Sequence, residues 1–289
     1  MKYFIKKLGF FCFAVGLFFT INSTINLFFI KNNAPLLKGA DILIVGDSHT
    51  ERSLNPDLFA SAENISQPAE PYVLTYWKLK SIFKTYKPDT LVLGFSHHNI
   101  SSFNDRKFSD KTWAMEMFRR SYSIEHFEDI DHTIKVDYDM YYSTLFHQIG
   151  FYPKAHHANY IGKYVNSNRS NISDWNDAVN RHFYESEGKS YMPSLTMINY
   201  LDSIVNLTIN NKVTLIMVSN PVVNNYRERI PDEIVTVYNE LKNKYRKNSI
   251  IIDKSNVSYP DSLFLNADHL NSKGAKRFTT SLIAELKKI

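Results

Sequence analysis

A short apolar run that ends at a glycine constrains the fold of this chain most. Residues 42–45 read Ile-Leu-Ile-Val, Gly46 ends the run, and Ser48 follows two positions later. An apolar run of this length, bounded by glycine, is typical of a buried parallel strand. Open α/β sheets place their chemistry at the carboxyl ends of such strands. Ser48 is therefore a candidate catalytic residue, although Asp47 and Ser48 also fit a simple cap of a helix over residues 51–59.

The alternation of strands and helices along the rest of the chain predicts the fold class. Further apolar runs predict strands over 62–66, 90–95, 212–219 and 249–253. Helical spacing of apolar residues predicts helices over 72–86, 194–210, 232–247 and 272–288. Because only short breaks separate them, the connections should be right-handed crossovers of a doubly wound parallel sheet in an α/β fold.

Residues 96–194 interrupt this alternation after the third strand. They are rich in Tyr, Phe, His and Asn, and about a hundred residues are too many for a bare loop in a compact domain. We expect a large, partly helical insertion that folds over the strand ends as a lid or substrate wall. Its aromatic residues could stack on sugar rings or form a local core: Trp113, Phe118, Tyr122, Tyr138, Tyr141, Tyr142 and Trp175.

The N-terminal segment predicts a membrane anchor. Lysines within the first seven residues precede an uncharged stretch over 8–30, which is long enough to span a bilayer as a transmembrane helix. A buried helix of a soluble protein is the alternative, but the stretch is apolar all round. Lysines before the span should keep the N-terminus cytoplasmic. We expect a cytoplasmic tip and signal anchor over 1–30, a linker over 31–40 and an extracytoplasmic domain over 41–289.

Charge and cysteine content exclude other functional classes. The net charge of +5 is modest and no basic block occurs, so nucleic acid is not an expected partner. The single Cys12 excludes an internal disulfide framework and a cysteine-based metal site. Histidines are adjacent at 97–98 and at 156–157. Neighbouring side chains point in different directions on a helix or strand, so the two histidines of a pair are not expected to bind one metal ion. We expect no metal and no cofactor.

A second group of candidate residues lies directly before the last predicted helix. Residues 264–274 contain Asn266, Asp268 and His269. The loop after the fifth strand opens on the same edge of the sheet as Ser48, so the histidine can approach that serine. Serine needs a base to take its proton, and the base works best when an acid or amide holds its other ring nitrogen. Asn266 and Asp268 are both candidates, although Asn271 as a helix cap also explains the segment.

These two blocks resemble a known family. Gly46-Asp47-Ser48 and Asp268-His269-Leu270-Asn271 are similar to the first and last blocks of SGNH (GDSL-type) hydrolases. Within that superfamily the chain looks most like membrane-anchored bacterial relatives of the teichoic-acid D-alanylation and alginate O-acetylation proteins. The resemblance implies a flavodoxin-like three-layer sandwich with a five-stranded parallel sheet. It also implies Ser48 as nucleophile, His269 as general base, and a place in the bacterial inner membrane.

The chain departs from the family pattern at three positions. The triad acid usually stands three residues before the histidine, where this chain has Asn266. The second block lacks its glycine, so the N–H of Ala69 or Glu70 would have to serve the oxyanion hole. The third block has Ser96 in place of the family's asparagine, and Asn99 or His97 could substitute for it.

Two functions therefore remain open from the sequence. The first is an anchored serine acyl-transfer enzyme, an O-acetylesterase or O-acyltransferase, with a glycan or acyl ester as substrate and the bilayer as a partner through residues 8–30. The second is a degenerate SGNH-like domain that is retained for glycan binding or for assembly of a cell-envelope complex.

Overall fold

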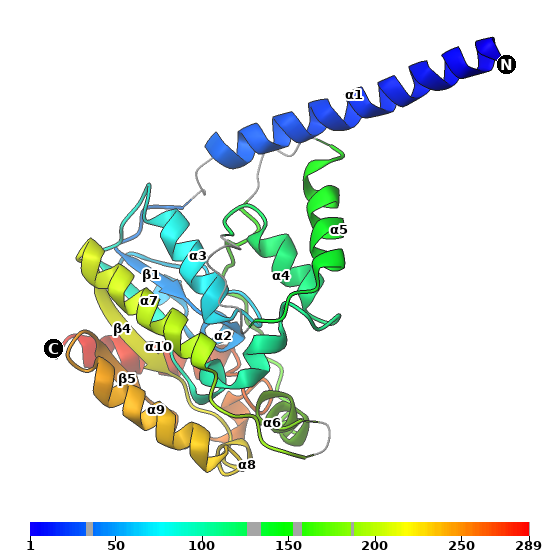
Figure 1. The fold of residues 1–289 in the computed structure, drawn as a ribbon. Helices are drawn as coiled ribbons and strands as arrows, with labels where there is room; N and C mark the ends of the chain where they lie inside the picture. Colours follow the sequence, from blue (N-terminus) through cyan, green and yellow to red (C-terminus); the bar gives the residue numbers. More distant parts are fainter. Residues whose placement is uncertain (33–36, 126–133, 153–157, 186–187, 289) are drawn as a thin grey trace.

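A computed structural model describes residues 1–32, 37–125, 134–152, 158–185 and 188–288 of the chain (Figure 1). Its centre is a five-stranded sheet with all strands parallel, in the order β2-β1-β3-β4-β5. The strands are β1 (Ile42–Val45), β2 (Ala62–Asn64), β3 (Thr90–Gly94), β4 (Thr214–Ser219) and β5 (Ile250–Asp253). This is the flavodoxin-like order, so the predicted α/β fold is confirmed.

Helices cover both faces of the sheet. Right-handed crossovers put α3 (Tyr72–Ile82), α7 (Leu195–Asn211) and α9 (Asp232–Tyr245) on one face. The other face carries α2 (Ser48–Ser53) and α10 (Ser272–Leu286), which contact each other. Figure 1 shows α3 and α7 in front of the sheet and α10 behind it.

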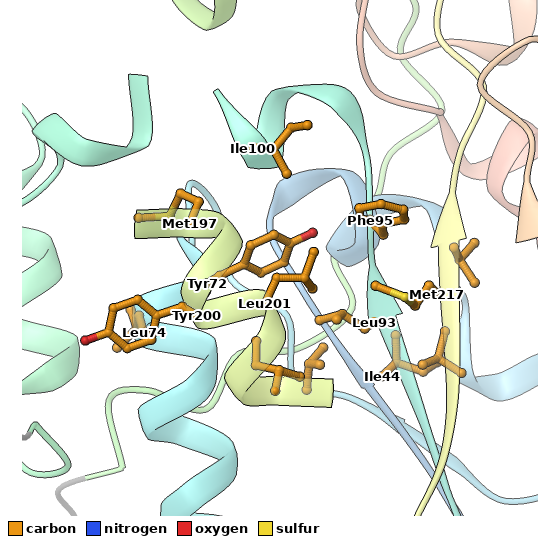
Figure 2. Close-up of a cluster of buried hydrophobic side chains, with 14 of the residues drawn as sticks. Ile44, Tyr72, Leu74, Leu93, Phe95, Ile100, Met197, Tyr200, Leu201 and Met217 are labelled. Atoms are coloured by element: carbon orange, nitrogen blue, oxygen red, sulfur yellow. The ribbon is translucent and has the colours of Figure 1, made fainter. Parts of the chain in front are cut away.

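The main core lies between the sheet and the α3–α7 layer. Figure 2 shows Ile44, Leu93 and Met217, from three neighbouring strands, in one buried cluster with side chains of α3 and α7. None of these three strand residues is more than 1% exposed. The central strands β1, β3 and β4 are therefore mostly apolar, because helices cover both of their faces.

Residues 51–59 do not form one continuous helix, and the fresh start near Pro56 that Asn55-Pro56 predicts in the sequence is confirmed. α2 ends at Ser53, and a separate 3-10 turn covers Pro56–Leu58. Asn55 causes the break, because its side-chain oxygen accepts the Asp57 N–H at 3.0 Å and starts the new turn. Proline in the first turn favours a fresh start.

The insertion after β3 is mostly short helices. It contains α4 (Ala114–Ser121), α5 (Tyr138–Ile149) and α6 (Trp175–Phe183), with 3-10 turns at His97–Ile100 and Ser102–Arg106. Another short helix, α8 (Asn224–Arg227), follows β4. Phe118 and Tyr122 of the insertion are buried, so these two aromatic residues form a local core.

The N-terminal helix α1 covers Lys2–Asn32 and contains the whole of residues 8–30. Within the described residues it is the one helix that is long and apolar enough to cross a membrane. It extends into the predicted linker over 31–40, of which residues 33–36 lie outside the described residues. Asn22 and Asn26 are its buried residues, and Figure 1 shows α1 projecting from the domain beside α5.

Two glycines allow α2 to pack closely over the ends of β1 and β3. A Cβ on Gly46 would lie 2.5 Å from Thr50 Oγ1, and a Cβ on Gly94 would lie 2.1 Å from the same atom. Gly46 also has a φ of 151°, which favours glycine. The first turn of α2, which carries Ser48, can therefore reach the sheet only because both strands end in glycine.

We expect Gly94→Ala to lower the free energy of unfolding by about 1–3 kcal/mol, since the new methyl group overpacks the contact with Thr50. Denaturant unfolding of the detergent-solubilised chain measures this. Adding Thr50→Ala should restore part of the loss, because it removes the atom that clashes. The account would be contradicted if the double variant lost as much unfolding free energy as the two single variants together.

Candidate functional site

Ser48 begins α2 at the carboxyl end of β1. Asp47 caps the helix, and its Oδ1 accepts the His49 N–H at 2.9 Å. The prediction that Asp47 caps a helix is thus confirmed, and this cap does not use the side chain of Ser48. Ser48 is half-buried at the sheet edge, where the strand order reverses between β1 and β3. Ligands bind at such switch points in open α/β sheets.

His269 approaches Ser48 from the loop before α10. Leu265 N–H donates to the His269 carbonyl at 2.8 Å, and an isolated bridge joins Phe264 to Leu270, so the loop is closed on itself. His269 Nε2 lies 2.8 Å from Ser48 Oγ. This is the separation expected of a nucleophile and its base. Two turns 221 positions apart in the chain thus meet.

Asn266 and Asp268 both lie at the other ring nitrogen of His269. Asn266 Oδ1 is 2.9 Å from Nδ1 and also accepts the His269 backbone N–H at 3.0 Å. Asp268 Oδ1 is 2.9 Å from Nδ1 as well, but its direction does not suit a hydrogen bond. We conclude that Asn266 accepts the Nδ1 proton, while Asp268 supplies negative charge beside the ring.

Asp268 is fully buried and surrounded by basic groups. His49 Nε2 lies 3.3 Å from its carboxylate, Arg181 Nη2 3.6 Å and His182 Nδ1 3.9 Å. Burial opposes ionisation, but the interactions with His269 and His49 outweigh it and hold the pKa of Asp268 well below its ordinary value. The residue therefore remains a carboxylate inside the protein.

A second carboxylate, Asp47, has its own partners. His98 Nε2 and the side-chain amide of Asn99 both donate to its Oδ2. Burial alone would raise the pKa of Asp47, but His98 and His49 hold it well below its ordinary value. His98 itself has a pKa lowered to about 4 by burial and by the neighbouring His49, so it is neutral at pH 7.

His49 lies between the two carboxylates. Its ring centre is 4.0 Å from that of His98 and 4.7 Å from that of His269. Burial disfavours its charged form, but Asp268 and Asp47 more than offset burial and raise the pKa of His49. Among His49, His98 and His182, His49 is thus the one that becomes protonated most readily, and it lies beside Ser48 and His269.

The histidine cluster does not fit a metal centre. His49, His98 and His182 place one ring nitrogen each within 4.8 Å of the others. However, His98 and His182 are stacked with 24° between their planes, and His49 and His98 differ by 31°. Metals bind the in-plane lone pairs of imidazole, and nearly parallel rings direct these lone pairs side by side, whereas a tetrahedral ion needs them to converge. The second group of possible ligands consists of His49, Asp268 and His269. Both ring nitrogens of His269 already have partners there, because Nε2 faces the Ser48 hydroxyl and Nδ1 faces the Asn266 amide oxygen.

A cavity of about 300 Å³ opens above Ser48 and His269. Ala69 and the aromatic residues Phe103 and Trp113 are among its described lining residues. Three basic side chains also line it: Arg52, Lys107 and Arg181. Burial lowers the pKa of Lys107 to about 7. The walls thus combine aromatic surface with positive charge around the serine hydroxyl.

The loop that carries Ala69 is held by its carbonyl groups. Lys107 Nζ donates to the Ala69 carbonyl at 2.8 Å, and Arg120 Nη1 donates to the Pro68 carbonyl at 2.6 Å. Ala69 has a φ of 57°, a left-handed conformation that is uncommon for alanine. In a trans peptide the N–H points away from the preceding carbonyl, so the Ala69 N–H points away from Arg120. The Glu70 N–H instead meets the Gln67 carbonyl, at 3.4 Å.

Ser96 and Asn99 have partners other than the cavity. The Ser96 hydroxyl lies 3.2 Å from the Ser219 hydroxyl, and the Asn99 amide donates to Asp47. Neither is among the described residues that line the cavity, whereas His98 is. His97, the other substitute considered, packs on Tyr238 with ring centres 4.0 Å apart. The expected oxyanion role of these residues does not match their placement. Their side chains contact Ser219, Asp47 and Tyr238 and do not line the cavity.

Sequence reasoning missed several residues of the site. His49 and His98 stand next to motif residues, so proximity to Ser48 and Asn99 was a usable signal. Arg181 and His182 belong to α6, within the insertion, and no pattern connected them to the motifs. The pair at 156–157 lies outside the described residues.

Comparisons with known proteins add little. No family model matches the chain, and no curated protein matches it significantly. One similar solved structure, a "putative platelet activating factor" from Streptococcus pneumonia, is 14% identical over 95% of this chain and 99% of that one, with a TM-score of 0.45. Another, a "putative acylhydrolase" from Bacteroides fragilis, is 12% identical over 90% and 92%, with a TM-score of 0.41. Likeness at this level carries no argument about function.

We expect Asp268→Asn to lower the pKa of His49, because burial still opposes the imidazolium after its main negative partner is lost. An NMR titration of the histidine ring signals measures this. Asp202→Asn, at a partly exposed carboxylate that pairs with Lys244, is the control and should leave His49 unchanged. A His49 pKa that is the same in both variants would contradict the assigned charge partner.

The interaction of His49 with Asp268 should also make the free energy of unfolding depend on pH. Because folding raises the His49 pKa, the stability that it contributes is complete below the unfolded value of about 6.5 and is lost as pH rises through the folded value. The difference in unfolding free energy between the unchanged chain and Asp268→Asn should therefore shrink above pH ~6.5. A difference that grows with pH in this range would show that the sign is wrong.

Proposed function

We propose that this chain is a membrane-anchored serine acyl-transfer enzyme of the SGNH type, an O-acetylesterase or O-acyltransferase acting on a cell-surface or exported glycan. The observation that carries the proposal is the 2.8 Å contact of Ser48 Oγ with His269 Nε2 at a cavity of about 300 Å³. A hydroxyl paired with an imidazole whose far nitrogen is fixed is the arrangement used for nucleophilic acyl transfer.

The chemistry follows from the positions of the two side chains. His269 Nε2 takes the proton as Ser48 Oγ attacks the acyl carbonyl carbon. His269 then gives that proton to the leaving sugar oxygen, and an acyl-serine ester remains. In the second half, His269 takes a proton from water or from an acceptor hydroxyl, whose oxygen attacks the ester carbonyl. His269 then returns this proton to Ser48 Oγ as the acyl group leaves. Water gives hydrolysis, whereas a sugar hydroxyl gives acyl transfer.

Asn266 and Asp268 would share the task of a triad acid. Asn266 accepts the Nδ1 proton and so keeps Nε2 available as the base. Asp268 lies 2.9 Å from the same nitrogen and stabilises the imidazolium that forms when His269 is protonated. The position of Asn266 therefore does not by itself argue for an inactive domain, because a buried carboxylate is still present.

The Ala69 N–H is the proposed oxyanion donor from the second loop. Ala69 lines the cavity, and Lys107 and Arg120 bind the carbonyl groups on either side of its N–H and so fix the peptide. A fixed N–H aimed at the developing negative charge lowers the barrier without reorganisation, and one such donor is typically worth about 10²–10³ in rate.

The glycan assignment has support from the walls of the cavity. Trp113 and Phe103 lie in its lining and offer flat apolar faces of the kind on which sugar rings stack. A volume of about 300 Å³ is at the lower end of the range for small-molecule sites, which suits a short acyl group with one sugar unit.

The anchor belongs to the same proposal. We propose residues 1–30 as cytoplasmic tip and signal anchor in the bacterial inner membrane and residues 41–289 as the extracytoplasmic catalytic domain. The length and apolar character of α1 support this, since its described residues satisfy the requirement for a span.

Ser48→Ala should reduce hydrolysis of p-nitrophenyl acetate by about 10⁴-fold or more, because the nucleophile is lost. It should also abolish covalent labelling by a fluorophosphonate. Ser203→Ala is the matched control, since it removes a helical serine hydroxyl that bonds to Asn199 on the remote α7. Equal labelling of the Ser48→Ala and Ser203→Ala variants would refute Ser48 as the nucleophile, whereas no labelling of either variant or of the unchanged chain would favour the glycan-binding alternative.

The chain should remain in the membrane fraction after an alkaline carbonate wash, because a spanning helix is held by the bilayer core. A C-terminal epitope should be removed when protease is added outside intact spheroplasts. Release by carbonate would contradict the anchor, and protection of the epitope would reverse the proposed orientation. A cytoplasmic marker protein serves as the control for intact cells.

A further inference from the structure

The exposed surface of α5 is divided into an aromatic and a polar stripe. Tyr138, Tyr142 and Phe146 follow one another at four-residue spacing, which puts them on one side of the helix. They are 59%, 62% and 46% exposed. The residues one position further on form an exposed polar stripe: Asp139, Ser143 and His147. Three large aromatic groups in a row are unusual on a surface that meets only water.

Contacts with α1 give the aromatic stripe a direction. Phe146 packs on Phe19 with ring centres 5.2 Å apart, while the Asn26 amide donates to the carbonyls of Ile149 and Tyr152 at 2.9 and 3.0 Å. The seven helical steps from Phe19 to Asn26 span about 10 Å. Phe19 is the one nearer the middle of the proposed span. The side of α5 that carries Phe146 therefore faces the membrane.

The polar residues of α1 give the depth of this contact. Asn22 and Asn26 are buried, although most of α1 is exposed. An amide left in hydrocarbon without partners costs several kcal/mol, so a partner at this level is required. For Asn26 the end of α5 supplies it, and Phe151 adds a second aromatic contact to Phe19. Figure 1 shows α5 with one end against α1 and the rest of the helix running away from it.

We propose that α5 lies at the outer surface of the bilayer, with Phe146 reaching into the acyl chains beside Phe19 and with Tyr138 and Tyr142 at the boundary between lipid headgroups and acyl chains. The inference rests on the proposed anchor and goes beyond it, because it assigns a second membrane contact and fixes the orientation of the domain. Tyrosine favours this boundary, and amphipathic helices there bury their apolar side by about 5–10 Å. The polar stripe with Ser143 then faces water.

The consequence concerns the catalytic cavity. A domain held by α1 alone could rotate about its linker, whereas contacts at both α1 and α5 keep it at one height and in one orientation. Trp113, which lines the cavity, immediately precedes α4, and α4 packs against α5. The cavity would thus stay close to the membrane surface and meet glycans that are presented there.

Single labels on the full chain test this in vesicles of phosphatidylcholine and phosphatidylglycerol. An environment-sensitive fluorophore is attached after Tyr142→Cys or Ser143→Cys, each in a Cys12→Ser background. Emission is quenched either by nitroxides on the lipid acyl chains or by iodide in the water. The two positions are neighbours on one helix, so they form a matched pair that differs only in the stripe.

We expect the label at position 142 to shift to shorter wavelength and to lose most of its emission to the lipid nitroxide. The label at position 143 should be quenched by iodide instead. A label on the natural Cys12 reports the anchor separately. Lipid quenching at Cys12 together with iodide quenching at both 142 and 143 would overturn the α5 contact, leave the anchor standing, and point to a protein partner for the aromatic stripe. Iodide quenching at all three positions would overturn both.

Discussion

Two buried carboxylates at the sheet edge determine how the surrounding chain must be arranged. A buried carboxylate without partners costs several kcal/mol, so each has to be enclosed by donors or positive charge. Asp47 receives His98 and Asn99 from the loop after β3. Asp268 receives His49 from α2 and Arg181 from α6. The insertion is therefore attached to the sheet by the charge requirement of the site as well as by apolar packing.

The sheet and the contact between Ser48 and His269 could be predicted because both depend on local patterns. An apolar run ended by glycine predicts a parallel strand, and parallel strands bring their carboxyl ends to one edge, where Ser48 and His269 meet. Arg181 could not be predicted, because no local pattern tells which edge a helix inside an insertion will pack against. The fresh start at Pro56 could be predicted too, because Asn55 caps the new turn and proline favours its first position.

Polar residues in α1 show a similar limit. In the sequence, Asn22 and Asn26 only dilute an apolar stretch, and this gives no reason for their presence. In the structure they are the buried residues of α1, and Asn26 bonds to main-chain carbonyls at the end of α5. Such amides cost free energy in lipid but stabilise a contact between two segments. They join the helix to the domain at one fixed level.

The division of labour between Asn266 and Asp268 explains how a site of this kind can do without an acid at the usual position. A triad acid both orients the histidine and stabilises its charge. Orientation needs a directed acceptor, which Asn266 supplies through one oxygen bonded to both the ring and the backbone N–H. Charge needs only proximity in a medium of low polarity, which the fully buried Asp268 supplies at 2.9 Å. Because the second requirement is not directional, the carboxylate can lie two positions away from the orienting residue.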